Sequence, residues 1–297
     1  NDESKNSMYL VIELVTGGDL QAPINQKRAQ TEATLRGWVC DAMLGLEHLH
    51  AHNIVHRDVK PENLLWDESS RQVKLADFGV STISGGGQHR DYITATAGTP
   101  AFYAPEMCGD DKTGARLFSG RAADVWALGV CLFMWLHHRL PFEAPTVYLL
   151  MQAVCHDHLE IDPKPQGLCS NDGAEGDAGM VAASAELLAV LRGLLAKKPQ
   201  QRMRIKDLRR DAWMTSGGTH PIAPPAHSGP TPAPGLRDLQ ESLRDAVVQL
   251  RGTKTLEKIN KVAKATGKRF LDESQAAAPP VAPPRPKARP GMLKRST

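Results

Sequence analysis

The spacing of hydrophobic residues predicts a mainly helical chain. Residues 8–15, MYLVIELV, form a short aliphatic run that ends at Thr-Gly-Gly, which predicts one strand leading into a turn. Helical spacing begins at Leu35 and continues to Leu49, and Thr31 ahead of it is a suitable N-cap. Further helices are expected near 121–137, 144–156 and 184–196.

Polar segments separate these elements. The stretches NLLW and QVKLAD are expected to form a small strand pair joined by the turn DESSR. Residues 80–105 are rich in Ser, Thr and Gly and read as a long loop, and the Gly/Asp/Ala-rich insertion 162–179 as a surface loop. The pattern predicts one mainly α lobe with short β-hairpins, entered through a single strand.

Charge divides the chain into two parts. Residues 1–216 contain 22 basic and 27 acidic residues, whereas residues 217–297 contain 14 basic and 6 acidic residues and are rich in Pro and Ala. A basic tail on an acidic globular part suggests that the tail meets an acidic partner or folds back on its own domain. The distribution does not suggest a nucleic-acid-binding fold, so we expect no nucleic-acid partner.

The cysteine pattern and the hydropathy indicate where in the cell the protein is expected to reside. The five Cys residues form no CxxC pair and no even framework, which favours a reducing intracellular location. The longest apolar run, residues 125–136, is too short to cross a bilayer, so we expect no transmembrane segment. We assign the chain to the cytoplasm and leave the nucleus open as a second location. Because it starts with Asn1 and not Met, we expect a piece of a longer protein.

The stretch IVHRDVKPENLL, residues 54–65, carries the chemistry. Asp58 and Asn63 are followed by Asp77 of an Asp-Phe-Gly sequence, and three converging oxygen-bearing side chains fit a phosphoryl-transfer site with Mg²⁺. In that scheme Asp58 accepts the proton of the attacking hydroxyl. Asn63 and Asp77 hold the metal on the phosphates, and Lys60 neutralises charge on the transferred group.

These motifs, followed by GTPAFYAPE at 98–106 and DVWALGV at 124–130, resemble the C-terminal lobe of a eukaryotic protein kinase over residues 8–215. The Lys two positions after Asp58, and GTP before APE, resemble the serine/threonine branch. The resemblance implies transfer of the ATP γ-phosphate to a Ser or Thr hydroxyl of a protein substrate, with ATP and Mg²⁺ as cofactors.

The resemblance also assigns the nucleotide pocket. It implies that Glu13 and Val15 offer hinge backbone groups to adenine, with Ile12 as gatekeeper and Leu65 as the floor. Asp19 falls where the family often contacts ribose.

Two structural contacts and one regulatory contact follow from the same resemblance. Glu106 is expected to pair with Arg202, and Asp124 to hold the catalytic-loop backbone. Arg57 is expected to pair with a phosphate on the activation segment. The candidate acceptors are Thr94 and Thr96, although both are equally well explained as polar loop residues.

Within the kinases, KLADFGVS, AGTPAFYAPE and FSGRAADVWALGV are similar to the calcium/calmodulin-dependent protein kinase kinases. Members of that group phosphorylate activation-loop threonines of other kinases in calcium and energy signalling, so the expected substrate is another kinase. Another calmodulin-kinase-like serine/threonine kinase is the alternative.

The basic tail has a helical pattern of its own. Residues 236–271 place apolar side chains at helical spacing, and their second half carries seven basic residues against one acidic. This is typical of a calmodulin target helix, although a helix packed on its own lobe or on a membrane surface fits as well. We therefore divide the rest of the chain into a linker (216–235), a regulatory segment (236–273) and a disordered tail (274–297).

The kinase pattern is incomplete on the N-terminal side. No glycine-rich loop, strand lysine or helix glutamate precedes Met8, and Lys74 follows the catalytic loop, in the wrong context for that lysine. We therefore expect a mainly α, kinase-like C-lobe with short β-hairpins, an N-lobe largely absent from the chain, and residues 1–7 as its remnant. Alone, such a fragment would be inactive. It would be either part of an active kinase or a non-catalytic docking module, and the intact catalytic residues favour the first.

Overall fold

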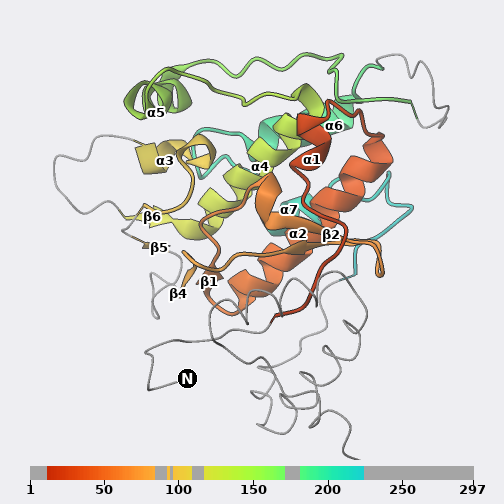
Figure 1. The fold of residues 1–297 in the computed structure, drawn as a ribbon. Coiled ribbons are helices and arrows are strands. Elements are labelled where there is room, and N and C mark those ends of the chain that lie inside the picture. The colour runs from red at the N-terminus through yellow and green to blue at the C-terminus, as the bar shows by residue number, and fades with distance from the viewer. Residues whose placement is uncertain (1–11, 84–91, 94–95, 109–116, 171–180, 224–297) are drawn as a thin grey trace, which may run out of the picture. The chain divides into compact units, whose positions relative to one another are not determined.

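The computed structural model describes residues 12–83, 92–93, 96–108, 117–170 and 181–223 (Figure 1). These belong, apart from Ile12, to one compact unit, Glu13–His227. Several predictions fall outside the described residues: residues 8–11 of the strand expected at 8–15, Thr94, residues 171–179 of the insertion, and the whole regulatory segment 236–273; residues 12–15 are described and form no strand.

Helices form most of the regular secondary structure among the described residues. The α-helices are α1 (Ala22–Asn25), α2 (Glu32–Ala51), α3 (Pro105–Cys108), α4 (Gly120–His137), α5 (Val147–His156), α6 (Ala185–Leu194) and α7 (Ile205–Leu208). Two 3₁₀-helices, η1 (Pro61–Asn63) and η2 (Pro100–Phe102), interrupt the loops. The helices expected near 121–137, 144–156 and 184–196 are thus confirmed as α4, α5 and α6.

The strands pair into three two-stranded antiparallel sheets: β1 (Ile54–Val55) with β4 (Thr82–Ile83), β2 (Leu64–Asp67) with β3 (Gln72–Leu75), and β5 (Tyr92–Ile93) with β6 (Phe118–Ser119). The β2–β3 hairpin confirms the expected strand pair. Its register pairs Leu64 with Leu75 and Asp67 with Gln72.

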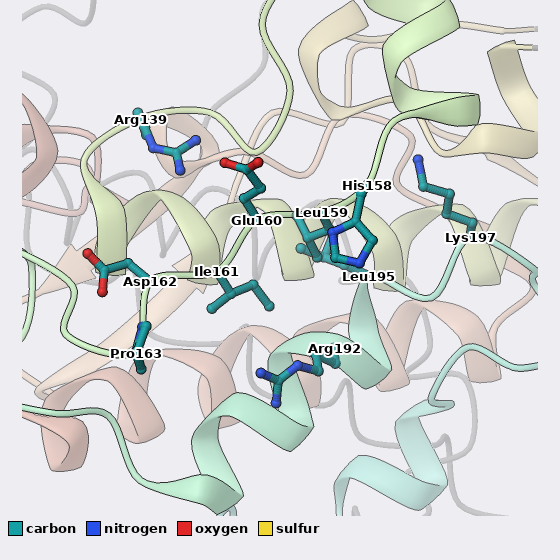
Figure 2. A pocket seen from close by; sticks show the side chains of 10 residues that line it. All are labelled: Arg139, His158, Leu159, Glu160, Ile161, Asp162, Pro163, Arg192, Leu195 and Lys197. Carbon is teal, nitrogen blue, oxygen red and sulfur yellow. The ribbon is translucent and has the colours of Figure 1, made fainter.

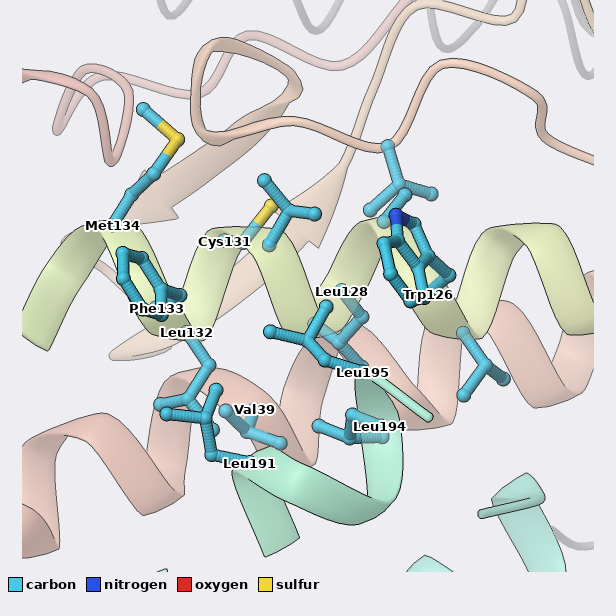
Figure 3. Packing of buried hydrophobic residues seen from close by; sticks show 14 of the residues in the cluster. Val39, Trp126, Leu128, Cys131, Leu132, Phe133, Met134, Leu191, Leu194 and Leu195 are labelled. Carbon is cyan, nitrogen blue, oxygen red and sulfur yellow. The ribbon is translucent and has the colours of Figure 1, made fainter. Parts of the chain in front are cut away.

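Helix α4 forms the centre of the core. Nearly all its side chains are buried, and α2 and α6 pack against it (Figure 3). The rings of Trp38 on α2 and Trp135 on α4 meet edge to face, with centroids 5.3 Å apart. Gly129 lets α6 approach closely, because a Cβ there would lie 2.8 Å from the Cβ of Leu194. A helix that is apolar all round is stable only when it is enclosed in this way.

Helix α2 begins as its sequence predicts. Thr31 is the N-cap, and its hydroxyl accepts a hydrogen bond from the backbone N–H of Thr34 at 3.1 Å. Glu32 in the first turn accepts hydrogen bonds from the backbone N–H of Ser184 (2.7 Å) and from Nε1 of Trp213 (2.9 Å). One carboxylate therefore joins the starts of α2 and α6 to the C-terminal end of the domain. Of the helices that the structure describes, none has the length and apolarity needed to cross a membrane.

Candidate active site

The catalytic loop, residues 56–63, is anchored to α4 through Asp124. The carboxylate of Asp124 accepts hydrogen bonds from the backbone N–H groups of His56 (3.0 Å) and Arg57 (2.9 Å), and from Nε2 of His50 (2.8 Å). Asp124 is 1% exposed, so these donors offset the cost of burying its charge. The expected contact of Asp124 with the loop backbone is confirmed.

Asp58 is buried at the centre of a hydrogen-bond network. Its Oδ1 accepts from the backbone N–H and the hydroxyl of Thr99, both at 2.9 Å. Its Oδ2 lies 2.8 Å from Nζ of Lys60 and accepts from Nδ2 of Asn63 at 3.1 Å. Burial raises the pKa of Asp58, but the hydrogen bonds from Lys60 and Thr99 outweigh it and hold the pKa below its usual value. The carboxylate is therefore ionised at neutral pH.

Thr99 is a site residue that the sequence interpretation missed. Its hydroxyl also accepts from Nζ of Lys60 at 3.0 Å, so it joins Lys60 and Asp58. The neighbouring Gly98 has a φ of +97°, and a Cβ there would lie 2.2 Å from the carbonyl oxygen of Arg57. Only glycine fits this approach, which brings Thr99 to the catalytic loop. The GTP sequence was the available signal, but we used it only to choose the kinase branch.

Asn63 and Asp77 are brought together by the β2–β3 hairpin. The backbone N–H of Ala76 donates to the carbonyl of Asn63 at 2.9 Å, so Asp77 follows directly beside Asn63. The Asn63 amide nitrogen donates to the Asp58 carbonyl at 2.8 Å, which turns the amide oxygen away from Asp58. The exposed Asp77 has a φ of 62° and accepts from the backbone N–H of Gly79 at 3.1 Å. A carboxylate and an amide oxygen are ligands of the type that Mg²⁺ prefers, and Asp77 and Asn63 supply one of each from segments whose backbones meet.

His56 links the catalytic loop to the Asp-Phe-Gly segment. Its Nε2 donates to the carbonyl of Ala76 at 3.0 Å, and its Nδ1 accepts from the backbone N–H of Asp58 at 3.3 Å. This pairing assigns the neutral tautomer with the proton on Nε2. The ring of Phe78 lies edge to face with the imidazole, with centroids 5.4 Å apart.

The segment that follows the expected hinge, residues 17–20, lies beside β2. Asp19 forms an isolated bridge with Leu65, and beyond it Leu20 donates to the carbonyl of Leu64 at 2.9 Å. The Oδ1 atom of Asp19 accepts from two backbone N–H groups at the start of α1, both at 3.1 Å. One of its oxygens is therefore engaged in holding that turn. Ile12 is 74% exposed in the residues described.

The Glu106–Arg202 pair is confirmed. The two guanidinium Nη atoms donate to the two carboxylate oxygens at 2.6 and 2.8 Å, a bidentate arrangement. Arg202 also donates to the carbonyls of Ala122 (2.8 Å) and Ala196 (3.0 Å), and it lies 5.1 Å from the ring centroid of Trp126.

The expected regulatory residues are only partly described. Arg57 has a φ of 72°, and its buried Nε has no hydrogen-bond partner among the residues that the structure describes. Thr96 is exposed, and Thr94 is outside the described residues.

A separate cavity of about 790 Å³ lies away from these residues. Figure 2 shows its lining, which includes Arg139, Ile161, Arg192 and Lys197. None of the predicted catalytic, nucleotide-binding or metal-binding residues lines it, so it is not part of the candidate active site.

Comparison with known proteins places the chain in a family. The sequence model of the protein kinase domain matches residues 2–214. Serine/threonine-protein kinase ssp1 of Schizosaccharomyces pombe is 37% identical over 220 residues, covering 73% of this chain and 31% of the relative. Calcium/calmodulin-dependent protein kinase kinase of Caenorhabditis elegans is 32% identical over 223 residues (75% and 37%). Serine/threonine-protein kinase GRIK1 of Arabidopsis thaliana is 34% identical over 215 residues (72% and 48%). The chain spans about a third to a half of the length of these relatives.

The expectation of an isolated C-lobe with its N-lobe largely absent is wrong. The match to the protein kinase domain begins at residue 2 and continues to residue 214, so a fragment confined to the C-lobe is not supported. The absence of three N-lobe motif residues ahead of Met8 does not exclude a match to the domain over residues 2–214. The docking-module alternative rested on the missing lobe and loses its basis. The chain belongs to the protein kinase family, and its homologues are serine/threonine protein kinases.

Proposed function

We propose that this protein transfers the γ-phosphate of ATP to a Ser or Thr hydroxyl of a protein substrate. The observation that carries the proposal is the environment of Asp58. Its carboxylate is buried yet kept ionised by Lys60 and Thr99, and Asn63 lies within 3.1 Å of it. Phosphoryl transfer requires a positioned anion, a nearby cation and oxygen ligands for Mg²⁺. Asp58 and Lys60 supply the first two, and Asn63 and Asp77 would supply the ligands.

Each residue has a role in this proposal. Asp58 orients the substrate hydroxyl and accepts its proton as the oxygen attacks phosphorus. Lys60, 2.8 Å from Asp58, is close enough to offset charge on the transferred group. Thr99 keeps the Asp58 carboxylate and the Lys60 ammonium in one geometry. Such preorganisation lowers the barrier because little has to reorganise during the reaction.

Residues in and next to the β2–β3 hairpin would contact both cofactors. Asn63 and Asp77 would hold Mg²⁺, which neutralises phosphate charge when bound. Adenine would meet the backbone of Glu13 and Val15 above Leu65. In support, residues 13–16 form no backbone hydrogen bond with the other residues that the structure describes.

Kinase assays on the complete gene product test the proposal. Asp58→Asn is expected to lower kcat about 10²–10⁴-fold, the usual contribution of a positioned general base. Asp77→Asn is expected to abolish the response of activity to added Mg²⁺. Asp207→Asn, an exposed carboxylate on α7, serves as the matched control. Full activity of Asp58→Asn would reject the proposal.

The substrate class is a finer proposal. The subfamily motifs, and a relative named calcium/calmodulin-dependent protein kinase kinase, support a substrate that is itself a kinase phosphorylated on its activation-loop threonine. Purified kinases, each made inactive and compared with its activation-loop Thr→Ala variant, provide the test. Phosphate on the wild-type substrate but not on the variant is the expected result. Equal labelling of both would contradict it.

Control through the activation segment is supported by Arg57. Its buried Nε has no hydrogen-bond partner among the residues that the structure describes, and a phosphate makes strong charge-assisted hydrogen bonds with Arg. Thr94 and Thr96 are the proposed acceptors. Thr96→Ala and Thr94→Ala should each be compared with Arg57→Gln for activity after phosphorylation. If both threonine variants are activated as strongly as the wild type, neither is the acceptor.

The tail is proposed to bind calmodulin or a similar partner through residues 236–271, which lie outside the described residues. Leu243→Asp with Val247→Asp is expected to abolish Ca²⁺-calmodulin binding by the full chain in calorimetry. Ser242→Asp with Gln249→Asp adds the same charge outside the apolar face of the expected helix and should retain binding. An absence of binding by the unaltered chain at low salt would remove this proposal.

A further inference from the structure

Lys74 bridges two carboxylates beside the expected nucleotide site. It lies on β3 directly opposite Leu65, the expected floor of the adenine pocket. Its Nζ lies 2.9 Å from Oδ2 of Asp67 and forms an ion pair with Oε1 of Glu13. Lys74 therefore connects the β2–β3 hairpin to the hinge segment, residues 13–16.

The hairpin end of this bridge is rigidly held. The Asp67 carboxylate accepts hydrogen bonds from the backbone N–H of Ser69 (3.0 Å) and from the hydroxyls of Ser69 (2.8 Å) and Ser70 (2.7 Å). These bonds and the one from Lys74 keep its pKa well below the usual value. Lys74 has its pKa raised by Glu13 and Asp67. The anchor is therefore charged and fixed over the physiological pH range.

The hinge end has little else to hold it. The backbone pairing of this segment with β2 begins only at Gly17, whose N–H donates to the carbonyl of Trp66 at 3.0 Å. Before that residue, no backbone hydrogen bond of the hinge segment is formed within the described structure, and Leu14 is 57% exposed. Among the described residues, the ion pair with Lys74 is the one polar side-chain contact of the hinge segment.

We propose that Lys74 is a positioning residue for the nucleotide: by pairing with Glu13 it fixes the hinge backbone at the place where adenine binds. The inference rests on the proposed function, because the adenine contacts of Glu13 and Val15 are part of that proposal. A hinge that is already ordered loses less conformational freedom when the ligand binds. Adenine lies far from the reacting phosphate, so its contacts act equally on the ground state and the transition state. Their loss raises KM and leaves kcat unchanged.

The test compares variants of the complete gene product in steady-state kinetics and in direct binding of ADP by calorimetry. Lys74→Met is expected to raise the KM for ATP and the Kd for ADP about three- to tenfold, the usual size of coupling between contacting residues, with kcat unchanged. Lys74→Arg should restore most of the affinity, because it keeps the charge. Glu13→Gln should match Lys74→Met, and the double variant should be no worse than either single one.

The control is Lys164→Met, which removes an exposed lysine that makes no side-chain contact among the described residues. If Lys74→Met is active and its KM for ATP and Kd for ADP are unchanged or lowered, the inference fails while the proposed function stands. Additive losses of nucleotide affinity in the double variant would also overturn it. So would a fall in kcat and Tm that accompanies the loss of affinity, because that result indicates a merely structural role. If the unaltered protein neither binds ADP nor transfers phosphate, the proposed function itself fails.

Discussion

Thr99 gives both its backbone N–H and its hydroxyl to one carboxylate oxygen of Asp58, each at 2.9 Å. The same hydroxyl accepts from Lys60, so a neutral side chain holds the anion and the cation together. Asp58 needs this support because burial alone would raise its pKa. The activation segment and the catalytic loop therefore form one site at this threonine.

Loss of the Thr99 hydroxyl should impair chemistry more than folding. Thr99→Val keeps the shape and the backbone donor but removes two side-chain hydrogen bonds. We expect kcat to fall at least about tenfold, because each hydrogen bond to a charged group contributes about 1.5–3 kcal/mol. Because a lowering contact is removed, the pKa of Asp58 rises, and the acid limb of the pH–rate profile moves to higher pH. Thr99→Ser should behave nearly as the wild type. A defect in Thr99→Ser as large as that in Thr99→Val would contradict the assignment of the effect to the hydroxyl alone.

The parts that could be predicted from the sequence rest on local signals. The cap at Thr31 and the apolar spacing up to Leu49 are contained within a few turns, so α2 was correctly placed. The spacing of Asp58, Asn63 and Asp77 was informative because one hairpin joins them, and their backbones meet where the N–H of Ala76 donates to the carbonyl of Asn63.

The contacts that could not be predicted join distant residues. Thr99 is 41 positions from Asp58, and Lys74 is 61 positions from Glu13. No periodicity records which side chains meet across such distances, because tertiary packing decides it. The N-lobe prediction was wrong for another reason: it rested on the absence of single motif residues, whereas the domain match begins at residue 2.

Asp124 is expected to be essential to stability as well as to the catalytic loop. In Asp124→Asn an amide nitrogen replaces one of the acceptors that bind His50, His56 and Arg57. Each buried donor left unpaired costs about 1–3 kcal/mol, so the free energy of unfolding in urea should fall by at least that amount. The exposed Asp207→Asn should change it by about 0–1 kcal/mol, as for a surface pair. Similar small effects for both would mean that Asp124 is dispensable.

Arg202 should not tolerate replacement by lysine. Lysine cannot supply the bidentate pair with Glu106 and also reach the carbonyls of Ala122 and Ala196. Breaking a buried pair costs about 3–5 kcal/mol, and Arg202→Lys should lose much of this in urea unfolding. Arg204→Lys, on an exposed residue two positions away, is the matched control. If Arg202→Lys and Arg204→Lys have the same urea midpoint, the positive charge alone accounts for the interaction of residue 202 with Glu106.

His137 should make the domain sensitive to mild acid. Burial, and then the nearby Arg139, lower its pKa from 6.5 to about 4, and its ring packs on Phe133 with centroids 4.2 Å apart. The unfolded chain takes up the proton near pH 6.5 while the folded chain refuses it until about pH 4. The stabilisation is therefore complete above pH 6.5 and is lost progressively as the pH falls toward 4.

Thermal unfolding between pH 7.5 and 4.5 measures this effect. His137→Gln is expected to unfold at a lower Tm than the wild type at pH 7.5, because it loses packing, but with a shallower decline of Tm toward acid. His158→Gln, which replaces an exposed histidine, should retain the wild-type slope. His137→Gln removes the group whose protonation is expected to lower Tm in acid. If its Tm falls with pH as steeply as that of the wild type, other groups cause the acid sensitivity.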